Sequence, residues 1–279
     1  MTGIGVRAIS VDDLNSVQRL LSRDPIAHCF VGARVSAGGA DPWRLGADVW
    51  GYFADGILQS LLHYGANTVP VETTPASRAS FADRLRTIPR RCSSFVGPAT
   101  EVLDLWRLLE PAWGPAREVR SSQPLLAMGT DSPRAVDAGV RRVDITELDI
   151  LLPACIDMFT SEVGVSPVAG ASGPGYRARI AELIRSGRAF ARIDNGRVMF
   201  KAEVGTATDG VCQVQGVWVA PELRGRGLAE PGMAAVVALA RASIAPTVSL
   251  YVNDFNTSAR KTYAAVGFEQ VGTFATVLF

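Results

Sequence analysis

The chain has 279 residues, of which 28 are basic, 27 are acidic and 48% are apolar. This length accommodates one large domain or two ordinary ones, each with a sizeable core. The net charge of +1 gives no overall electrostatic attraction, so we expect no nucleic acid and no membrane surface as a main partner. The basic residues include only two lysines, Lys201 and Lys261, which we interpret as a codon bias towards arginine.

The four cysteines are widely spaced and form no CxxC pair. This favours buried free thiols in a reducing compartment over disulfides or a metal site. The N-terminal residues have neither a basic start nor a sustained apolar stretch, and the longest apolar run, 233–240, is far shorter than the ~20 residues that cross a bilayer. We therefore expect a cytoplasmic protein without a metal. The cysteines are Cys29, Cys92, Cys155 and Cys212.

Two segments that lie 134 positions apart match in residue type. Val6-Arg7-Ala8-Ile9 corresponds to Val140-Arg141-Arg142-Val143, and Asp13-Leu14 corresponds to Glu147-Leu148. In each copy a strand-like run precedes apolar residues at helical spacing. The match predicts an internal duplication.

Both halves also contain a hairpin signal after the first helix. Asp55-Gly56 and Asn195-Gly196 each stand between two strand-like runs and tolerate the positive φ angles of a type I′ turn. Both halves then read strand, helix, hairpin, strand, helix, strand, which predicts an α/β or α+β fold. Turn-forming residues at 129–139 place the boundary there, giving predicted domains 1–135 and 139–279.

A second stretch of turn-forming residues, 165–175, lies inside the C-terminal half. It joins a helix predicted to end near Gly164 to one predicted to start at Tyr176. It is either a plain surface connection or a cover over a binding site.

The most informative segment is a Val-rich strand, 211–220, followed by a glycine-containing loop and a helix with Pro231 in its first turn. A loop of this kind lets backbone N–H groups converge on an anion at the positive end of the helix dipole. Arginines in the loop add charge where phosphate oxygens would lie. The loop residues are Arg224, Gly225, Arg226, Gly227, Leu228 and Ala229.

Three nucleotide-binding motifs compete for this loop. A P-loop requires Gly-Lys-Ser/Thr, and the loop has no lysine. A Rossmann fingerprint requires glycine where Glu230 stands and an acidic residue closing the next strand, which here runs Thr247 to Asn253. The loop instead fits, at every fixed position, the Q/R-x-x-G-x-G/A pattern of the GNAT acyltransferase superfamily.

The resemblance to GNAT proteins continues in a helix of the form N-x-x-A-x-x-x-Y-x-x-x-G-F. Residues 140–279 are similar to a GNAT domain, whereas residues 1–138 share the layout but not the motifs. The resemblance implies two tandem GNAT-like domains, each with a mixed, mostly antiparallel sheet flanked by helices. The helix residues that fit the pattern are Asn256, Ala259, Tyr263, Gly267 and Phe268.

In GNAT enzymes acyl-CoA lies in the gap between the strands on either side of the loop. The resemblance therefore implies acetyl-CoA as the acyl donor, with its pyrophosphate on the amides of 224–229. Asn256 would cap its helix or contact the cofactor. Tyr263 would protonate the departing thiolate, or else is a packed aromatic. The strand residues that would contact the pantetheine arm and the thioester carbonyl are Val217, Trp218 and Val219, with a main-chain group acting as an oxyanion hole.

The group that takes a proton from the acceptor is less defined. Many family members use an acid on the strand before the loop, where this chain has Gln213 and Gln215, neither of which is a base. Glu203 on the neighbouring strand and Glu162 at the end of the first helix of this half are the candidates, and water is the alternative. Glu230 would repel a pyrophosphate unless it points into solvent or pairs with an arginine of the loop.

In the first half we expect the counterpart of the loop at 91–100. The single Gly97, followed by Pro98, cannot present a run of amides to a pyrophosphate. We therefore expect a degenerate GNAT-like domain that lacks the CoA loop. Its tryptophans are expected to pack in the core or between domains: Trp50, Trp106 and Trp113.

These features predict an acyl-CoA-dependent N-acetyltransferase that moves an acetyl group directly to a primary amine of a small molecule or peptide, as a monomer or a homodimer. Two alternatives stay open. The missing acid on the strand before the loop favours an acyl-CoA-binding or sensing module without turnover. The tandem arrangement resembles actinobacterial small-molecule acetyltransferases, including those of the mycothiol synthase type.

Overall fold

In the computed structural model, which describes residues 5–279, the chain forms two compact units. The first contains the described residues up to Leu126 together with Tyr251–Asn256 and Gln270–Phe279, and the second contains Ala127–Leu250 and Thr257–Glu269. The predicted domains 1–135 and 139–279 follow the sequence repeat rather than these contacts, and they stay a prediction. The N-terminal segment used to predict the cellular location lies partly outside the described residues.

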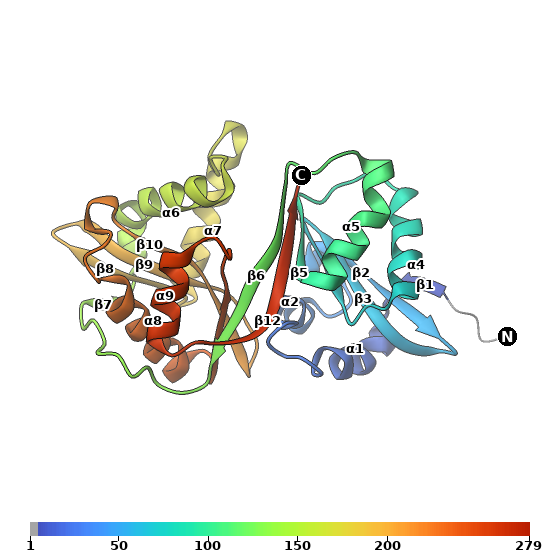
Figure 1. The fold of residues 1–279 in the computed structure, drawn as a ribbon, viewed down its shortest axis with the longest axis horizontal. Helices are drawn as coiled ribbons and strands as arrows, with labels where there is room; N and C mark the ends of the chain where they lie inside the picture. Colours follow the sequence, from blue (N-terminus) through green and yellow to red (C-terminus); the bar gives the residue numbers. More distant parts are fainter. Residues whose placement is uncertain (1–4) are drawn as a thin grey trace. The chain divides into compact units, whose positions relative to one another are not determined.

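The first unit is built on a sheet with strand order β1-β2-β3-β4-β5-β12-β6. The pairs from β1 to β4 and the pair β5/β12 are antiparallel, whereas β4 and β5 are parallel. The C-terminal strand β12, red in Figure 1, therefore lies beside β5 of this unit. The strands are β1 (Gly5–Ala8), β2 (Ala47–Ala54), β3 (Ile57–Gly65), β4 (Asn67–Val71), β5 (Ser94–Pro98), β6 (Glu118–Met128) and β12 (Glu269–Leu278).

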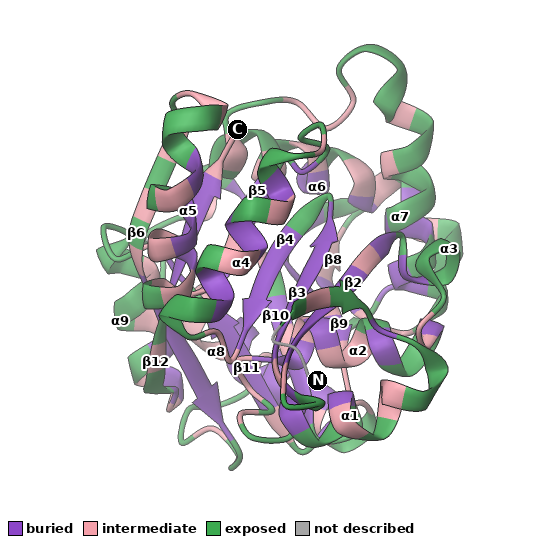
Figure 2. Cartoon of the chain, turned by 90° about the vertical axis from the view of Figure 1, so that its right-hand side faces the viewer, coloured by how far each residue is buried: buried purple, intermediate pink, exposed green. Residues whose placement is uncertain are grey.

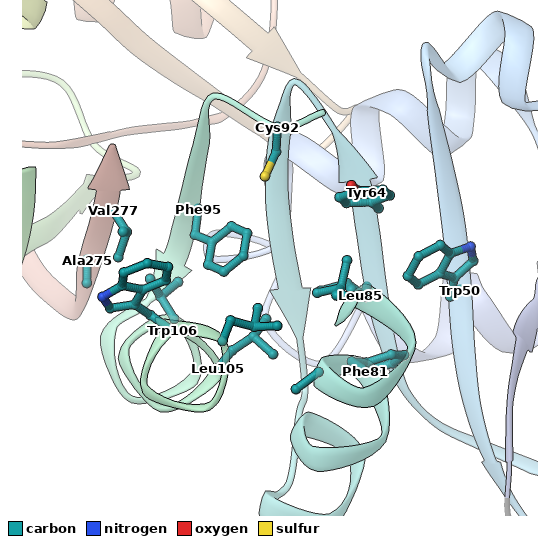
Figure 3. Packing of buried hydrophobic residues seen from close by; sticks show 14 of the residues in the cluster. Trp50, Tyr64, Phe81, Leu85, Cys92, Phe95, Leu105, Trp106, Ala275 and Val277 are labelled. Carbon is teal, nitrogen blue, oxygen red and sulfur yellow. The ribbon is translucent and has the colours of Figure 1, made fainter. Parts of the chain in front are cut away.

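Helices cover both faces of this sheet, because alternate residues of its strands point to opposite sides. One cluster packs α4 and α5 against one face, where Trp50 and Trp106 are buried in the core (Figure 3). The other packs α1 and α2 against the opposite face, with Leu61 and Val69. Figure 2 shows β3 and β4 buried under α4, whose outer residues are exposed. The helices are α1 (Leu14–Leu21), α2 (Cys29–Gly38), α3 (Pro42–Leu45), α4 (Pro75–Arg86) and α5 (Ala99–Trp113).

The second unit has strand order β11-β10-β9-β8-β7. Only β10 and β11 are parallel, and the other pairs are antiparallel. The predicted mixed, mostly antiparallel sheet flanked by helices is thus confirmed. The elements are β7 (Val140–Arg142), α6 (Leu148–Val163), α7 (Gly173–Arg185), β8 (Ala189–Asp194), β9 (Arg197–Ala207), β10 (Val211–Val219), α8 (Ala229–Ser243), β11 (Thr247–Tyr251) and α9 (Thr257–Val266).

The internal repeat carries the same ion pair in both copies. Arg7 contacts Asp13 at 2.7 Å (Nη1 to Oδ2), and Arg141 contacts Glu147 at 2.7 Å (Nη2 to Oε1). Each pair is bidentate and ties a strand to the short 3₁₀ turn before the following helix. The match at an offset of 134 positions therefore reflects the same local structure.

Both predicted hairpins form with the expected backbone. Asp55 and Gly56 have φ angles of 50° and 77°, and Asn195 and Gly196 have 51° and 73°. Helix α6 ends at Val163, and its C-cap Gly164 is in the left-handed region, as expected for a helix predicted to end near Gly164.

The prediction for the next helix was wrong by three residues. Helix α7 starts at Gly173 rather than Tyr176, because Pro174 fits the first turn of a helix, where its missing N–H is not needed. A 3₁₀ turn at Gly170–Ser172 occupies part of the predicted connection.

The prediction of buried cysteine thiols is confirmed for all four. Within residues 5–279, no helix combines the length and the apolar character that a membrane crossing requires.

Candidate functional site

Strands β10 and β11 pair with each other only over the first residues of each strand. Their parallel register extends from Val211↔Thr247 to Gln213↔Ser249, whereas β10 continues to Val219. Among the described residues, the second half of β10 therefore has no partner on β11. This is the splayed geometry in which main-chain groups of a strand remain available to a ligand.

A β-bulge lies in this second half of β10. The register between β9 and β10 shifts between Gln215 and Trp218, and Gly216 between them has a φ of +62°. A bulge bends its strand and redirects the main-chain groups that follow. A glycine inside a strand pattern signals such a bulge, so Gly216 is a signal of this bulge within the sequence itself.

The loop after β10 presents several unused backbone donors. Gly225 and Gly227 adopt φ angles of +74° and +76°, and a Cβ on either would meet no atom within 4 Å. Among residues 5–279, no acceptor is found for the N–H groups of Gly225, Gly227 and Leu228. The next amides belong to the first turn of α8, where helices leave N–H groups unsatisfied. Together these donors form an anion-binding arrangement at a helix N-terminus.

Two charged side chains at the loop are held by contacts with other parts of the second unit. Arg224 donates from Nε to the main-chain oxygen of Val219 at 3.1 Å, so it fixes the loop to the end of β10. Glu230 does not pair with a loop arginine, because its Oε2 lies 3.6 Å from Nε of Arg134, in the segment before β7. The positive charge of Arg134 partly offsets the repulsion between this carboxylate and an anion at the loop.

Tyr263 and Glu162 lie within electrostatic range of each other. Tyr263, on α9, is 7% exposed, and burial, followed by the charge of Glu162, raises the pKa of its hydroxyl. Glu162 is an exposed residue at the C-terminal end of α6. The structure thus brings together the predicted proton donor and one predicted base.

Glu203 has a different environment. It is 5% exposed, and its Oε2 lies 3.3 Å from Nζ of Lys201. Its Oε1 accepts a hydrogen bond of 3.0 Å from Nε2 of Gln215. A carboxylate held on both oxygens in this way is poorly placed to accept a proton from an acceptor.

Trp218 has a side-chain hydrogen bond, and Asn256 lies at the start of a helix. The indole Nε1 of Trp218 donates to Oδ2 of Asp157 on α6 at 2.8 Å, which fixes the side chain and leaves main-chain groups to serve a ligand. Asn256 directly precedes α9 and has the position of an N-cap. Asp157 could not be identified from the sequence, because nothing local links it to Trp218.

The counterpart of the loop in the first unit is not at 91–100, and that prediction was wrong. The parallel pair β4/β5 corresponds to β10/β11, so the counterpart is the turn between β4 and α4, residues 72–74. It has no glycine, and Glu101 occupies its donors, because Oε2 accepts from N and Oγ1 of Thr73 at 2.7 and 2.6 Å. The amide of Thr74 donates to Oγ of Ser77. This unit therefore lacks the anion loop for a reason other than Gly97 and Pro98.

Comparison with known proteins agrees with this geometry. Residues 174–268 match the Acetyltransferase (GNAT) family, and residues 47–151 match a domain of unknown function (DUF4081). No curated protein matches the chain significantly.

Several solved structures share the fold over the whole chain. A GCN5-related N-acetyltransferase from Sphaerobacter thermophilus is similar with a TM-score of 0.61 at 16% identity, covering 98% of this chain and 94% of that chain. An acetyltransferase of the GNAT family from Colwellia psychrerythraea has a TM-score of 0.58 at 14% identity, with 98% and 99% covered. A tandem GNAT protein from the clavulanic acid biosynthesis pathway has a TM-score of 0.53 at 16% identity, with 98% of each chain covered.

Proposed function

We propose, from the premise that this chain belongs to the GNAT family, that it transfers an acetyl group from acetyl-CoA to a primary amine. The observation that carries the proposal is the set of unused amides at Gly225, Gly227 and Leu228, at the end of a strand that separates from its parallel neighbour. Oriented N–H groups at a helix N-terminus suit a pyrophosphate. In this proposal the amides of 224–229 hold the pyrophosphate.

The second half of β10 would hold the rest of the donor. Main-chain groups at Val217 and Val219 are redirected by the bulge at Gly216, and the proposal assigns them to the pantetheine arm and the thioester oxygen. A preorganised N–H near that oxygen stabilises the charge that develops on it. Trp218 contributes main-chain contacts only, since Asp157 holds its side chain.

The bound thioester supplies an acyl carbon that is open to attack by an amine. As the amide bond forms, the carbon–sulfur bond breaks, one proton leaves the nitrogen and one reaches the sulfur. Tyr263 is protonated throughout the physiological range, because burial raises its pKa, and the proposal makes it the donor to sulfur.

The proposal makes Glu162 rather than Glu203 the acceptor of the amine proton. Glu162 is exposed and acts electrostatically on Tyr263, whereas Glu203 is buried in an ion pair with Lys201. An exposed carboxylate close to the proton donor can pass its proton to solvent after each turnover.

The direct test is thiol release from acetyl-CoA with a panel of primary amines, comparing the wild type with Tyr263→Phe. We expect release with at least one amine and a loss of kcat of roughly a hundredfold or more in the variant. Binding of acetyl-CoA without release by any amine would favour the acyl-CoA-sensing module, which the glutamines at 213 and 215 also suit. Absence of acetyl-CoA binding in calorimetry would refute both functions.

A further inference from the structure

The second unit contains a buried charged cluster beneath the bulge of β10 to which the proposed reaction assigns no role. Lys201 is 1% exposed and Glu203 is 5% exposed, and both lie on β9 with Nζ and Oε2 3.3 Å apart. Burying two charges costs solvation energy that a surface pair does not lose. A pair kept in such a place therefore calls for a function.

The cluster lies directly against the bulge. Glu203 pairs with Gln215 and Lys201 pairs with Trp218 in the β9/β10 register, so the extra residue of β10 falls between them. A Cβ added to Gly216 would lie 3.0 Å from Nζ of Lys201 and 3.1 Å from Cδ of Glu203. The two charged groups therefore lie directly against Gly216, together with Cε of Met158 at 3.0 Å.

Further contacts fix the pair from the other elements. Gln215 donates to Glu203, and Cys155 on α6 interacts electrostatically with Lys201. Burial alone would lower the pKa of Lys201, but Glu203 and Cys155 hold that pKa above its usual value. The ammonium is therefore charged at neutral pH.

We propose that the Lys201–Glu203 pair positions the bulge of β10, and through it the main-chain groups of Val217, for acyl transfer. Neither side chain exchanges a proton with the substrates. The pair fills the space under Gly216 with a balanced charge, so the bulge keeps one conformation. This inference rests on the proposed function, because Val217 matters only if β10 binds the acyl donor.

The composition of the chain supports a specific role for Lys201. The chain has only two lysines among its 28 basic residues, so arginine is the default cation. A lysine has a compact ammonium with three rotatable donors, whereas arginine has a broad planar fork. The compact ammonium of Lys201 pairs with Glu203 and lies 3.0 Å from the Cβ position of Gly216, where a guanidinium would take more room.

Two single variants should respond to pH in opposite directions. Lys201→Met leaves a buried unpaired carboxylate, whose pKa rises, so kcat should fall at least tenfold as pH increases through that pKa and recover below it. Glu203→Gln leaves a buried ammonium, whose pKa falls, so kcat should fall as pH decreases through that value. KM for acetyl-CoA should change less than threefold in both, since the loop at 224–229 is untouched.

The other titratable groups around the pair would not produce these profiles. Burial raises the pKa of Cys155 to about 11 and raises that of Tyr176 on α7, which Arg179 partly offsets. Gln215 on β10, Met158 on α6 and the alanines opposite the pair on β8 do not titrate. A change between pH 5 and 9 is therefore assigned to the partner left unpaired.

The double variant Lys201→Met/Glu203→Gln separates positioning from proton transfer. It removes both charges at similar volume, so we expect it to regain at least half of the lost kcat at every pH. A double variant that stays as inactive as the worse single variant would overturn the proposal and assign proton transfer to Glu203. Val198→Ala, in the core at the other end of β9, is the control for loss of stability alone. A kcat loss in Lys201→Met that equals this control and does not depend on pH would also overturn the proposal.

Hydrogen exchange of the amides at 216–219 measures how stably the bulge holds its conformation, and it does not require turnover. We expect faster exchange than wild type in Lys201→Met at high pH and no change in Val198→Ala at the same pH. Unchanged exchange in both single variants would overturn the positioning role. If the wild type releases no thiol with any amine, the proposed function fails, while this measurement still decides whether the pair holds the bulge.

Discussion

The backbone of the loop at 224–229 provides the sharpest test of the donor site. Gly225 has a φ of +74° and a Cβ there would meet nothing within 4 Å. Alanine at this position therefore fits sterically, and its cost comes from the left-handed backbone alone, about 1–2 kcal/mol. The loop can escape that cost by turning the residue to negative φ, which rotates its amide away from the anion.

The expected effect on affinity follows from the hydrogen bonds lost. A hydrogen bond to a charged group contributes about 1.5–3 kcal/mol, so one misdirected amide should weaken acetyl-CoA binding roughly ten- to a hundredfold. Isothermal titration calorimetry with Gly225→Ala measures this change directly. Thermal unfolding should show a decrease of only a few degrees, since about 1 kcal/mol shifts Tm by roughly 2–4 °C in a protein of this size.

Gly196 is a matched control within the same unit. It has a φ of +73° and open space around a Cβ, but it lies in the hairpin between β8 and β9. Gly196→Ala should lower Tm as much as Gly225→Ala and leave the affinity for acetyl-CoA unchanged. Equal weakening of binding by both variants, or none by Gly225→Ala, would refute the assignment of the pyrophosphate to the loop.

Two further predictions concern single carboxylates. Glu162→Gln should lower kcat by roughly a hundredfold or more in the thiol-release assay, whereas Asp149→Asn, on the same helix and paired with Arg177 on the surface, should leave kcat unchanged. Burial raises the pKa of Glu101 in the folded first unit, against hydrogen bonds from Thr73. Its contribution to stability is therefore full below the unfolded pKa of about 4.3 and is lost as pH rises through the folded pKa. Thermal unfolding of Glu101→Gln should lack this component of the pH dependence, and identical profiles for the two proteins would contradict it.

The sequence was informative where a short stretch determines its own conformation. Asp55-Gly56 and Asn195-Gly196 specify type I′ turns by themselves, and both form. The position of β12 could not be predicted in this way. Its residues follow the GNAT-like helix in the chain, yet it pairs with β5 from Phe274↔Pro98 to Leu278↔Ser94. Nothing local to a strand identifies its neighbour in a sheet when that neighbour is far away in the sequence.

The loop of the first half was predicted at the wrong position because β4 contains a residue that is unusual in strands. This strand contains Pro70, which removes a ladder donor and usually argues against a strand, yet Pro70 pairs with Leu62 of β3. The segment 91–100 contains β5 and the start of α5, one strand later in the fold than β4, which precedes the counterpart of the loop. The actual counterpart, between β4 and α4, has its first amide bonded to Glu101.

The two units therefore differ in whether the backbone amides at this position of the fold are available to an anion. In the second unit, glycines with positive φ leave amides unbonded at the N-terminus of α8. In the first unit, the Glu101 carboxylate takes the place that an anionic ligand would need. A carboxylate from the chain itself is present at an effectively high local concentration, so a free anion cannot readily displace it. One acetyl-CoA per chain is the stoichiometry that follows, and calorimetry of the wild type would contradict this account of the first unit if it found two.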